Sequence, residues 1–195
     1  MRDDLFSVPI RKYHVDNNDE FLKLTEDVYQ KSKFDVPSPF IYGIAAVPPE
    51  ISSTYNDLLE NFLQDIGCYD THNAVVNSMI VKILEPGESI DRCDTLPSHY
   101  TLTHYVQVPD GDASDTFHHP ARSVVTAFAP AYIDEWRNAA GIYVNQGDVI
   151  IHPSFLETSS PVNEVPSSKR ITLTLTILLN PNEQGRESNT KKPVA

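Results

Sequence analysis

Two segments near the start of the chain carry apolar residues at helical spacing. The first follows capping residues at 16–19, ends near Ser32 and has its apolar positions at Phe21, Leu24, Val28 and Tyr29. The second opens at Pro48-Pro49-Glu50 and ends at Gly67, with an apolar stripe of Ile51, Tyr55, Leu58, Leu59, Phe62, Leu63 and Ile66. We expect both helices to pack on a sheet as scaffold.

Elsewhere the chain reads as short strands separated by turn residues. Strands are predicted over residues 5–15 (an edge strand containing a proline), 73–84, 99–108, 123–128, 143–152 and 170–179. In the last of these Thr alternates with Ile and Leu, which predicts one buried face and one face lined by hydroxyls. Residues 35–49 contain four prolines and are predicted to be mostly loop.

This order of elements predicts an α+β fold. Two helices followed by many short strands indicate a β-sandwich or jelly roll with the helices packed on one sheet. We expect one domain over residues 1–180 and a polar C-terminal tail over residues 181–195.

Composition narrows the classes of partner. Apolar residues make up 40% of the chain, which indicates a globular protein. The net charge of −12 would repel phosphate groups, so nucleic acid and anionic membranes are not expected partners. The first residues lack the apolar core of a secretory signal, and no apolar run approaches the roughly 20 residues of a membrane span. We therefore expect a protein made in the cytoplasm.

The last third of the chain carries a recognisable arrangement of motifs. Residues 147–156, GDVIIHPSFL, are followed by Lys169-Arg170-Ile171-Thr172. This part resembles the end of the 2-oxoglutarate/Fe(II)-dependent oxygenases, in particular the group common in bacteriophage genomes. Residues 5–10 and 98–109 resemble that family's opening segment and central strand. The resemblance covers about residues 4–180 and implies a double-stranded β-helix, the jelly roll of the cupins.

The same resemblance assigns the family's functional positions. The arginine that binds the far carboxylate of 2-oxoglutarate falls on Arg170, and its hydroxyl partner falls on Thr172. These oxygenases hold iron with two histidines and a carboxylate. The distal histidine position is Thr158, and the first pair of ligand positions is Cys93 and Thr95, or Arg92 and Asp94 if the alignment shifts by one residue. The resemblance therefore implies that the ligand positions Cys93, Thr95 and Thr158 are vacant.

Several other candidates stay open at this point. A rearranged metal site built from Asp94, His104 and His152 is conceivable if neighbouring strands bring them together. The acidic stretch Asp110–Asp115 lacks the glutamate of a calcium loop and is predicted to be a solvated turn. Trp136, Tyr132 and Tyr143 are predicted to pack in the core rather than form an exposed patch.

Three functions follow from these assignments. The first is a non-catalytic oxygenase-like domain with no metal or cofactor, which binds protein partners in a large assembly such as a phage virion, as a neck, tail or capsid-associated structural protein. The alternative is an active Fe(II)/2-oxoglutarate-dependent dioxygenase, a hydroxylase with rearranged ligands, which needs Fe(II) and 2-oxoglutarate. The third is a metal-free module that binds a small ligand in the mouth of the jelly roll.

Overall fold

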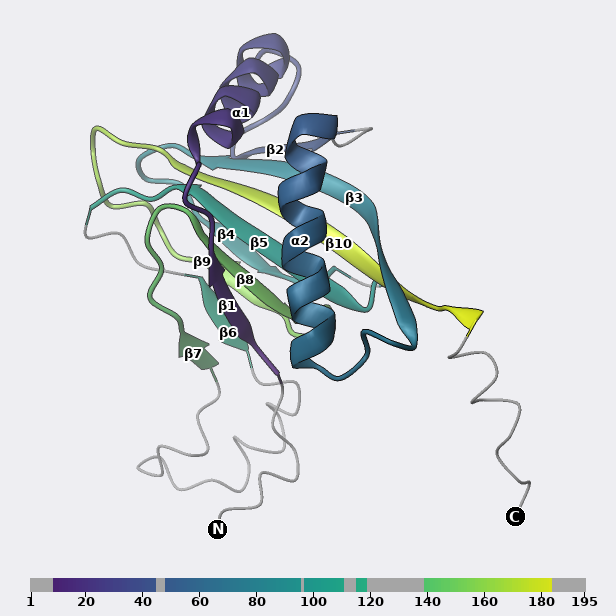
Figure 1. Ribbon diagram of the computed structural model, residues 1–195. Helices are drawn as coiled ribbons and strands as arrows, with labels where there is room; N and C mark the ends of the chain where they lie inside the picture. Colours follow the sequence, from purple (N-terminus) through teal and green to yellow (C-terminus); the bar gives the residue numbers. More distant parts are fainter. Residues whose placement is uncertain (1–8, 45–47, 96, 111–114, 119–138, 184–195) are drawn as a thin grey trace, which may run out of the picture.

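The computed structural model describes residues 9–44, 48–95, 97–110, 115–118 and 139–183 (Figure 1). Its two helices are α1 (Asp19–Ser32) and α2 (Pro49–Asp65). Its strands are β1 (Arg11–His14), β2 (Phe40–Ile44), β3 (His72–Leu84), β4 (Ile90–Cys93), β5 (Tyr100–Gln107), β6 (Thr116–His118), β7 (Ala139–Gly141), β8 (Asp148–Pro153), β9 (Thr158–Ser160) and β10 (Arg170–Pro181).

The strands form two antiparallel sheets. The major sheet has the order β1-β8-β5-β10-β3-β2, and the minor sheet has the order β4-β9-β6-β7. The long strand β10 lies in the middle of the major sheet, where it pairs with β3 along its whole length and with β5 along its first half. Four short strands therefore face a larger sheet, as a jelly roll requires.

Both helices cover the outer face of the major sheet (Figure 1). Phe21 of α1 and Phe62 of α2 belong to one buried cluster with alternate residues of the central strands, among them Leu102, Val149, Leu173 and Leu175. The apolar stripes predicted from helical spacing are the surfaces that make this contact. Gly67 ends α2 with a φ of +71°, a conformation that glycine adopts without strain.

The inner face of the major sheet packs against the minor sheet. Tyr105 and Ile150 of the major sheet and Phe117 of β6 form a second buried cluster with Leu156. Residues of β5, β8 and β10 are thus buried on both faces, one against the helices and one against the minor sheet. The prediction of a single buried face for β10 was wrong, because its threonine face is covered as well.

The other predicted helices and strands agree with the structure in part. The helices and the strands at 73–84, 99–108 and 170–179 agree with α1, α2, β3, β5 and β10 to within a few residues. The prediction that residues 35–49 are mostly loop did not include β2, in which Phe40–Ile44 pairs with β3. The strand predicted at 143–152 begins only at Asp148. Of the predicted edge strand at 5–15, β1 covers Arg11–His14. The strand predicted at 123–128 lies outside the described residues.

Among the described residues, no helix is long and apolar enough to cross a membrane.

Candidate functional site

The space between the two sheets contains the residues that the sequence singled out. Alternation along β10 points Arg170, Thr172, Thr174 and Thr176 into this space and points the intervening Ile and Leu residues toward the helices. Arg170 is 2% exposed and Thr172 is 6% exposed. The candidate site is therefore a buried polar interior rather than an open surface.

The minor sheet supplies the opposite wall. Cys93 of β4 lies directly opposite Thr158 of β9, and Thr158 lies opposite Phe117 of β6. Residues opposite each other on antiparallel strands point to the same face. Because Phe117 packs with Tyr105 and Ile150 between the sheets, Cys93 and Thr158 face the interior too. The register thus brings together two positions that the resemblance assigns to iron ligands.

The neighbouring residue Arg92 points the other way. Its guanidinium lies 3.2 Å from the Glu157 carboxylate and donates a hydrogen bond of 2.9 Å to Nδ1 of His118. Glu157 precedes the inward-facing Thr158, and His118 follows the inward-facing Phe117. Arg92, Glu157 and His118 therefore lie on the outer face of the minor sheet. The alignment that is shifted by one residue, with Arg92 and Asp94 as ligand positions, is therefore wrong for β4. Asp94 is exposed.

The His118 ring also approaches a serine. Its Nε2 lies 2.8 Å from Oγ of Ser159. Because Arg92 donates to Nδ1, the neutral ring carries its proton on Nε2 and donates to the serine. This arrangement is the reverse of a base that activates a nucleophile.

Thr95, the third assigned ligand position, belongs to a hydroxyl cluster. Its Oγ1 shares a hydrogen bond with Oγ1 of Thr101, which in turn lies 2.8 Å from Oγ of Ser154. Ser98 Oγ is also 2.8 Å from Ser154 Oγ and donates to the Thr95 carbonyl. The three positions Cys93, Thr95 and Thr158 therefore present one thiol and two neutral hydroxyls.

This set does not fit the iron of an oxygenase. Iron(II) in such sites takes two imidazoles and a carboxylate, and a neutral hydroxyl is a poor replacement for either. Over the described parts of the chain, no group of three histidine, cysteine, aspartate or glutamate side chains lies close enough together to hold a metal ion.

The two buried imidazoles cannot complete such a site, because they lie on opposite faces of the major sheet. His104 faces the helices, where Tyr55 Oη is 2.9 Å from its Nδ1 and the Phe21 ring packs edge-on at 4.6 Å. His152 faces the interior, where its ring packs edge-on against Phe117 at 5.0 Å and Nδ1 donates to the Pro153 carbonyl. The rearranged site of Asp94, His104 and His152 was a wrong hypothesis.

Burial also determines the charge of both rings. It lowers the pKa of His104 to about 4, and the charge of His14 acts in the same direction. Burial likewise lowers the pKa of His152 to about 4, although the Pro153 carbonyl and Asp115 act against the change. Both imidazoles are therefore neutral at pH 7.

A buried cluster surrounds the predicted anion-binding pair Arg170 and Thr172. Tyr105 lies opposite Thr172 in the register, and its hydroxyl donates a 2.8 Å hydrogen bond to Oδ2 of Asp115. Ser160 donates a 2.6 Å hydrogen bond to Oδ1 of the same carboxylate. Arg170 Nη1 donates to the Pro161 carbonyl at 3.3 Å. A basic and an acidic side chain are thus enclosed in the same interior.

Electrostatics links the members of this cluster. Burial raises the pKa of Tyr105 well above its ordinary value, Asp115 raises it further, and the positive charge of Arg170 acts in the opposite direction. The prediction of a solvated turn was wrong at Asp115, which is 8% exposed. Sequence reasoning missed Asp115 and Ser160 because they gave no motif, whereas strand alternation could have placed Tyr105 on the face of Thr101 and Thr103.

The fold is shared with solved enzymes. A Pseudomonas putida prolyl-4-hydroxylase superimposes with a TM-score of 0.56 at 11% identity, over 90% of this chain and 95% of that one. A viral collagen prolyl hydroxylase from Paramecium Bursaria Chlorella virus-1, in its 2OG complex, gives 0.54 at 16% identity, over 86% and 94%. An oxidoreductase of the 2OG-Fe(II) oxygenase family from Burkholderia pseudomallei gives 0.55 at 13% identity, over 90% and 86%.

The fold is the double-stranded β-helix of the 2-oxoglutarate oxygenases. The predicted fold class is therefore confirmed, including the two helices packed on the sheet. The chain matches no protein-family model and no curated protein sequence. At identities of 11–16% the likeness establishes the fold, and the chemistry has to be argued from this chain's own residues.

Proposed function

We propose that this chain is a non-catalytic oxygenase-like domain that acts in protein–protein assembly. The observation that carries the proposal is the register of β4 with β9. It points Cys93 and Thr158 into the interior at the assigned ligand positions, where the oxygenases carry histidine or carboxylate ligands. The further assignment to a phage virion, as a neck, tail or capsid-associated component, rests on the resemblance to the oxygenase group of bacteriophage genomes.

Exposed apolar side chains support a role in assembly. Tyr143 is 91% exposed and Phe34 is 88% exposed. Ile41 and Tyr42 are exposed on β2, which is the edge strand of the major sheet. Edge strands with exposed apolar residues are common sites for protein contacts. The prediction that Tyr143 packs in the core was wrong, and its proposed neighbours Tyr132 and Trp136 lie outside the described residues.

The charged cluster also fits a structural role. Oxygenases of this fold use the arginine for the co-substrate carboxylate, whereas here the enclosed Asp115 carboxylate already accepts hydrogen bonds from Tyr105 and Ser160 in the same interior. The carboxylate of Asp115 and the guanidinium of Arg170 both lie close enough to Tyr105 to act on its pKa, in opposite directions. The pair Arg170 and Thr172 then acts as part of the buried framework.

Iron binding tests the proposal. The natural chain, loaded with Fe(II) under anaerobic conditions and desalted, should keep no stoichiometric metal and should form no succinate from 2-oxoglutarate. The variant C93H/T95D/T158H should gain about one equivalent of iron, because these positions face the interior together. The matched control R92H/T158H, which creates a His-x-Asp pair with Asp94, should gain none because residue 92 faces outward. Near-ultraviolet circular dichroism checks that each variant is folded.

The outcome that overturns the proposal is equally definite. One tightly bound iron in the natural chain, together with succinate formation, would establish the alternative of an active Fe(II)/2-oxoglutarate dioxygenase. A rise in melting temperature with 2-oxoglutarate in the absence of metal, abolished by Arg170→Ala, would instead establish a metal-free ligand-binding module.

A further inference from the structure

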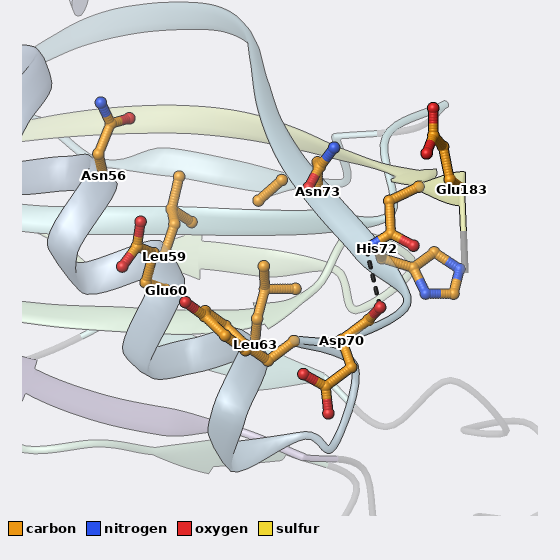
Figure 2. Close-up of a pocket in the computed structure, with 11 residues that line it drawn as sticks. Asn56, Leu59, Glu60, Leu63, Asp70, His72, Asn73 and Glu183 are labelled. Atoms are coloured by element: carbon orange, nitrogen blue, oxygen red, sulfur yellow. Dashed lines mark hydrogen bonds between the residues drawn. The ribbon is translucent and has the colours of Figure 1, made fainter. Parts of the chain in front are cut away.

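A groove of about 610 Å³ lies between α2 and the start of β3, away from the jelly-roll interior (Figure 2). Its apolar floor consists of Leu59 and Leu63 of α2 together with Ala74 of β3. A second hollow of about 420 Å³ shares Asn56 and Ala74 with it and continues toward Ile44. The two together form a path along the first half of β3.

The rim of the groove is acidic. Glu60 comes from α2, Asp70 from the turn before β3, and Glu183 from the end of the described chain after β10 (Figure 2). All three are exposed, and no lysine or arginine of the described residues lines the groove. Over the residues that the structure describes, these carboxylates form no ion pair. Three carboxylates from three elements therefore offer a complementary site to a basic segment.

One edge of β3 is also open for hydrogen bonding. β2 pairs only with Met79–Ile83 of β3, and β10 occupies the other side of the strand. No described strand pairs with the outer edge of His72–Ser78. Val75, within this stretch, is 43% exposed. An extended segment in the groove would find backbone donors and acceptors along this edge, in the manner of an added strand.

The chain contains a segment of the required charge. Residues 184–195, QGRESNTKKPVA, carry the basic residues Arg186, Lys191 and Lys192 and the single acidic residue Glu187, in a chain whose net charge is −12. The segment follows directly on Glu183, which lines the groove. Twelve extended residues span at most about 40 Å, and the open edge of β3 is about 20 Å long. The segment is long enough to follow the whole edge.

We infer that residues 184–195 bind in this groove within the same molecule, as an added strand along His72–Ser78 of β3. Because the segment leaves β10 at the His72 end, it runs parallel to β3. Its basic residues pair with the carboxylates of Glu60, Asp70 and Glu183. Backbone hydrogen bonds and ion pairs act together to hold the segment, and the covalent link strengthens binding further by giving the segment a high effective concentration at the groove. A basic segment of an assembly partner would have to displace it.

Peptide binding tests the inference. A chain that stops at Glu183 should bind a fluorescent peptide of residues 184–195 in an anisotropy titration, and binding should weaken as salt is added. The full chain should bind this peptide at least tenfold more weakly, because its own segment competes. A peptide carrying R186Q, K191Q and K192Q should also bind about tenfold more weakly to the shortened chain. Equal affinity for both peptides, or equal binding by both chains, would overturn the inference.

Variants of the groove provide the matched comparison. In the shortened chain, E60Q/D70N/E183Q should reduce peptide affinity at least tenfold, whereas D57N, on α2 but outside the groove lining, should leave it unchanged. The backbone amides of residues 73–77 that point to the open edge should exchange more slowly in the full chain than in the shortened one, and equal exchange would refute the added strand. Light scattering should find a monomer in both cases. A dimer that disappears on shortening would show that the segment binds a second copy instead.

Discussion

Asp115 is a carboxylate enclosed between the two sheets, where Tyr105 and Ser160 donate to its two oxygens. We expect Asp115→Ala to lower the free energy of unfolding by about 2 kcal/mol, because the fully buried Tyr105 hydroxyl loses its acceptor. Asp115→Asn keeps an acceptor and should cost less. Urea unfolding followed by circular dichroism measures both changes.

A double-mutant cycle isolates the contact itself. Tyr105→Phe should cost about 1 kcal/mol less in the Asp115→Ala background than in the natural chain, because its partner is already absent. Strictly additive losses would contradict a coupling between this hydroxyl and this carboxylate.

Of this buried cluster, Arg170 and Thr172 could be predicted from the family motif. Asp115 could not, because an acidic loop residue becomes buried only through tertiary contacts that its local sequence does not encode.

β10 has two buried faces of different character, and its threonines differ among themselves. Thr176 shares a 2.7 Å hydrogen bond with Ser78 of β3, whereas the buried Thr174 hydroxyl has no hydrogen-bond partner in the described parts of the chain. Thr176→Val should therefore lower the free energy of unfolding by about 1 kcal/mol. Thr174→Val should leave it unchanged or raise it, because valine removes an unsatisfied hydroxyl. Thermal unfolding compares the stability of the two variants. An equal loss of stability in both would show that the Thr174 hydroxyl has a hydrogen-bond partner in solution.

The elements that were predicted correctly are those with a strong local signal. α2 and β10 are long and periodic, so apolar spacing alone defines them. β6 and β9 have three residues each and exist because they pair with one another. β2 was missed because the prolines around it favour a loop, while its pairing partner β3 lies far along the chain. Short strands form because they pair with neighbouring strands rather than because of the propensity of their own residues.

At the scale of the whole molecule, register determines what the site can hold. The motif of residues 147–156 and the strand at 170–179 were enough to predict the double-stranded β-helix. They could not decide between two alignments of β4, because a shift of one residue exchanges its inner and outer faces. The pairing of Cys93 with Thr158 supplies that decision. The fold can therefore be predicted from the sequence pattern. The chemistry, in contrast, depends on which residues stand at a few inward-facing positions.

The buried imidazoles make the stability of the whole domain depend on pH. Burial lowers the pKa of both His104 and His152 to about 4, compared with an ordinary value of 6.5. Between these values the unfolded chain binds more protons than the folded one, so the free energy of unfolding falls as the pH falls from about 6.5 to 4. The full loss is about 3 kcal/mol for each ring.

Urea titrations at pH 7, 5.5 and 4.5 should show this loss in one cooperative transition, since both rings belong to the same folded unit. His104→Gln and His152→Gln should each remove part of the pH dependence. Their effects should add in the double variant, because the rings lie on opposite faces of the sheet and share no partner. A double variant that loses stability with pH as steeply as the natural chain would show that other groups cause the acid sensitivity. An additive result would show that helix packing and jelly-roll closure both depend on a neutral imidazole.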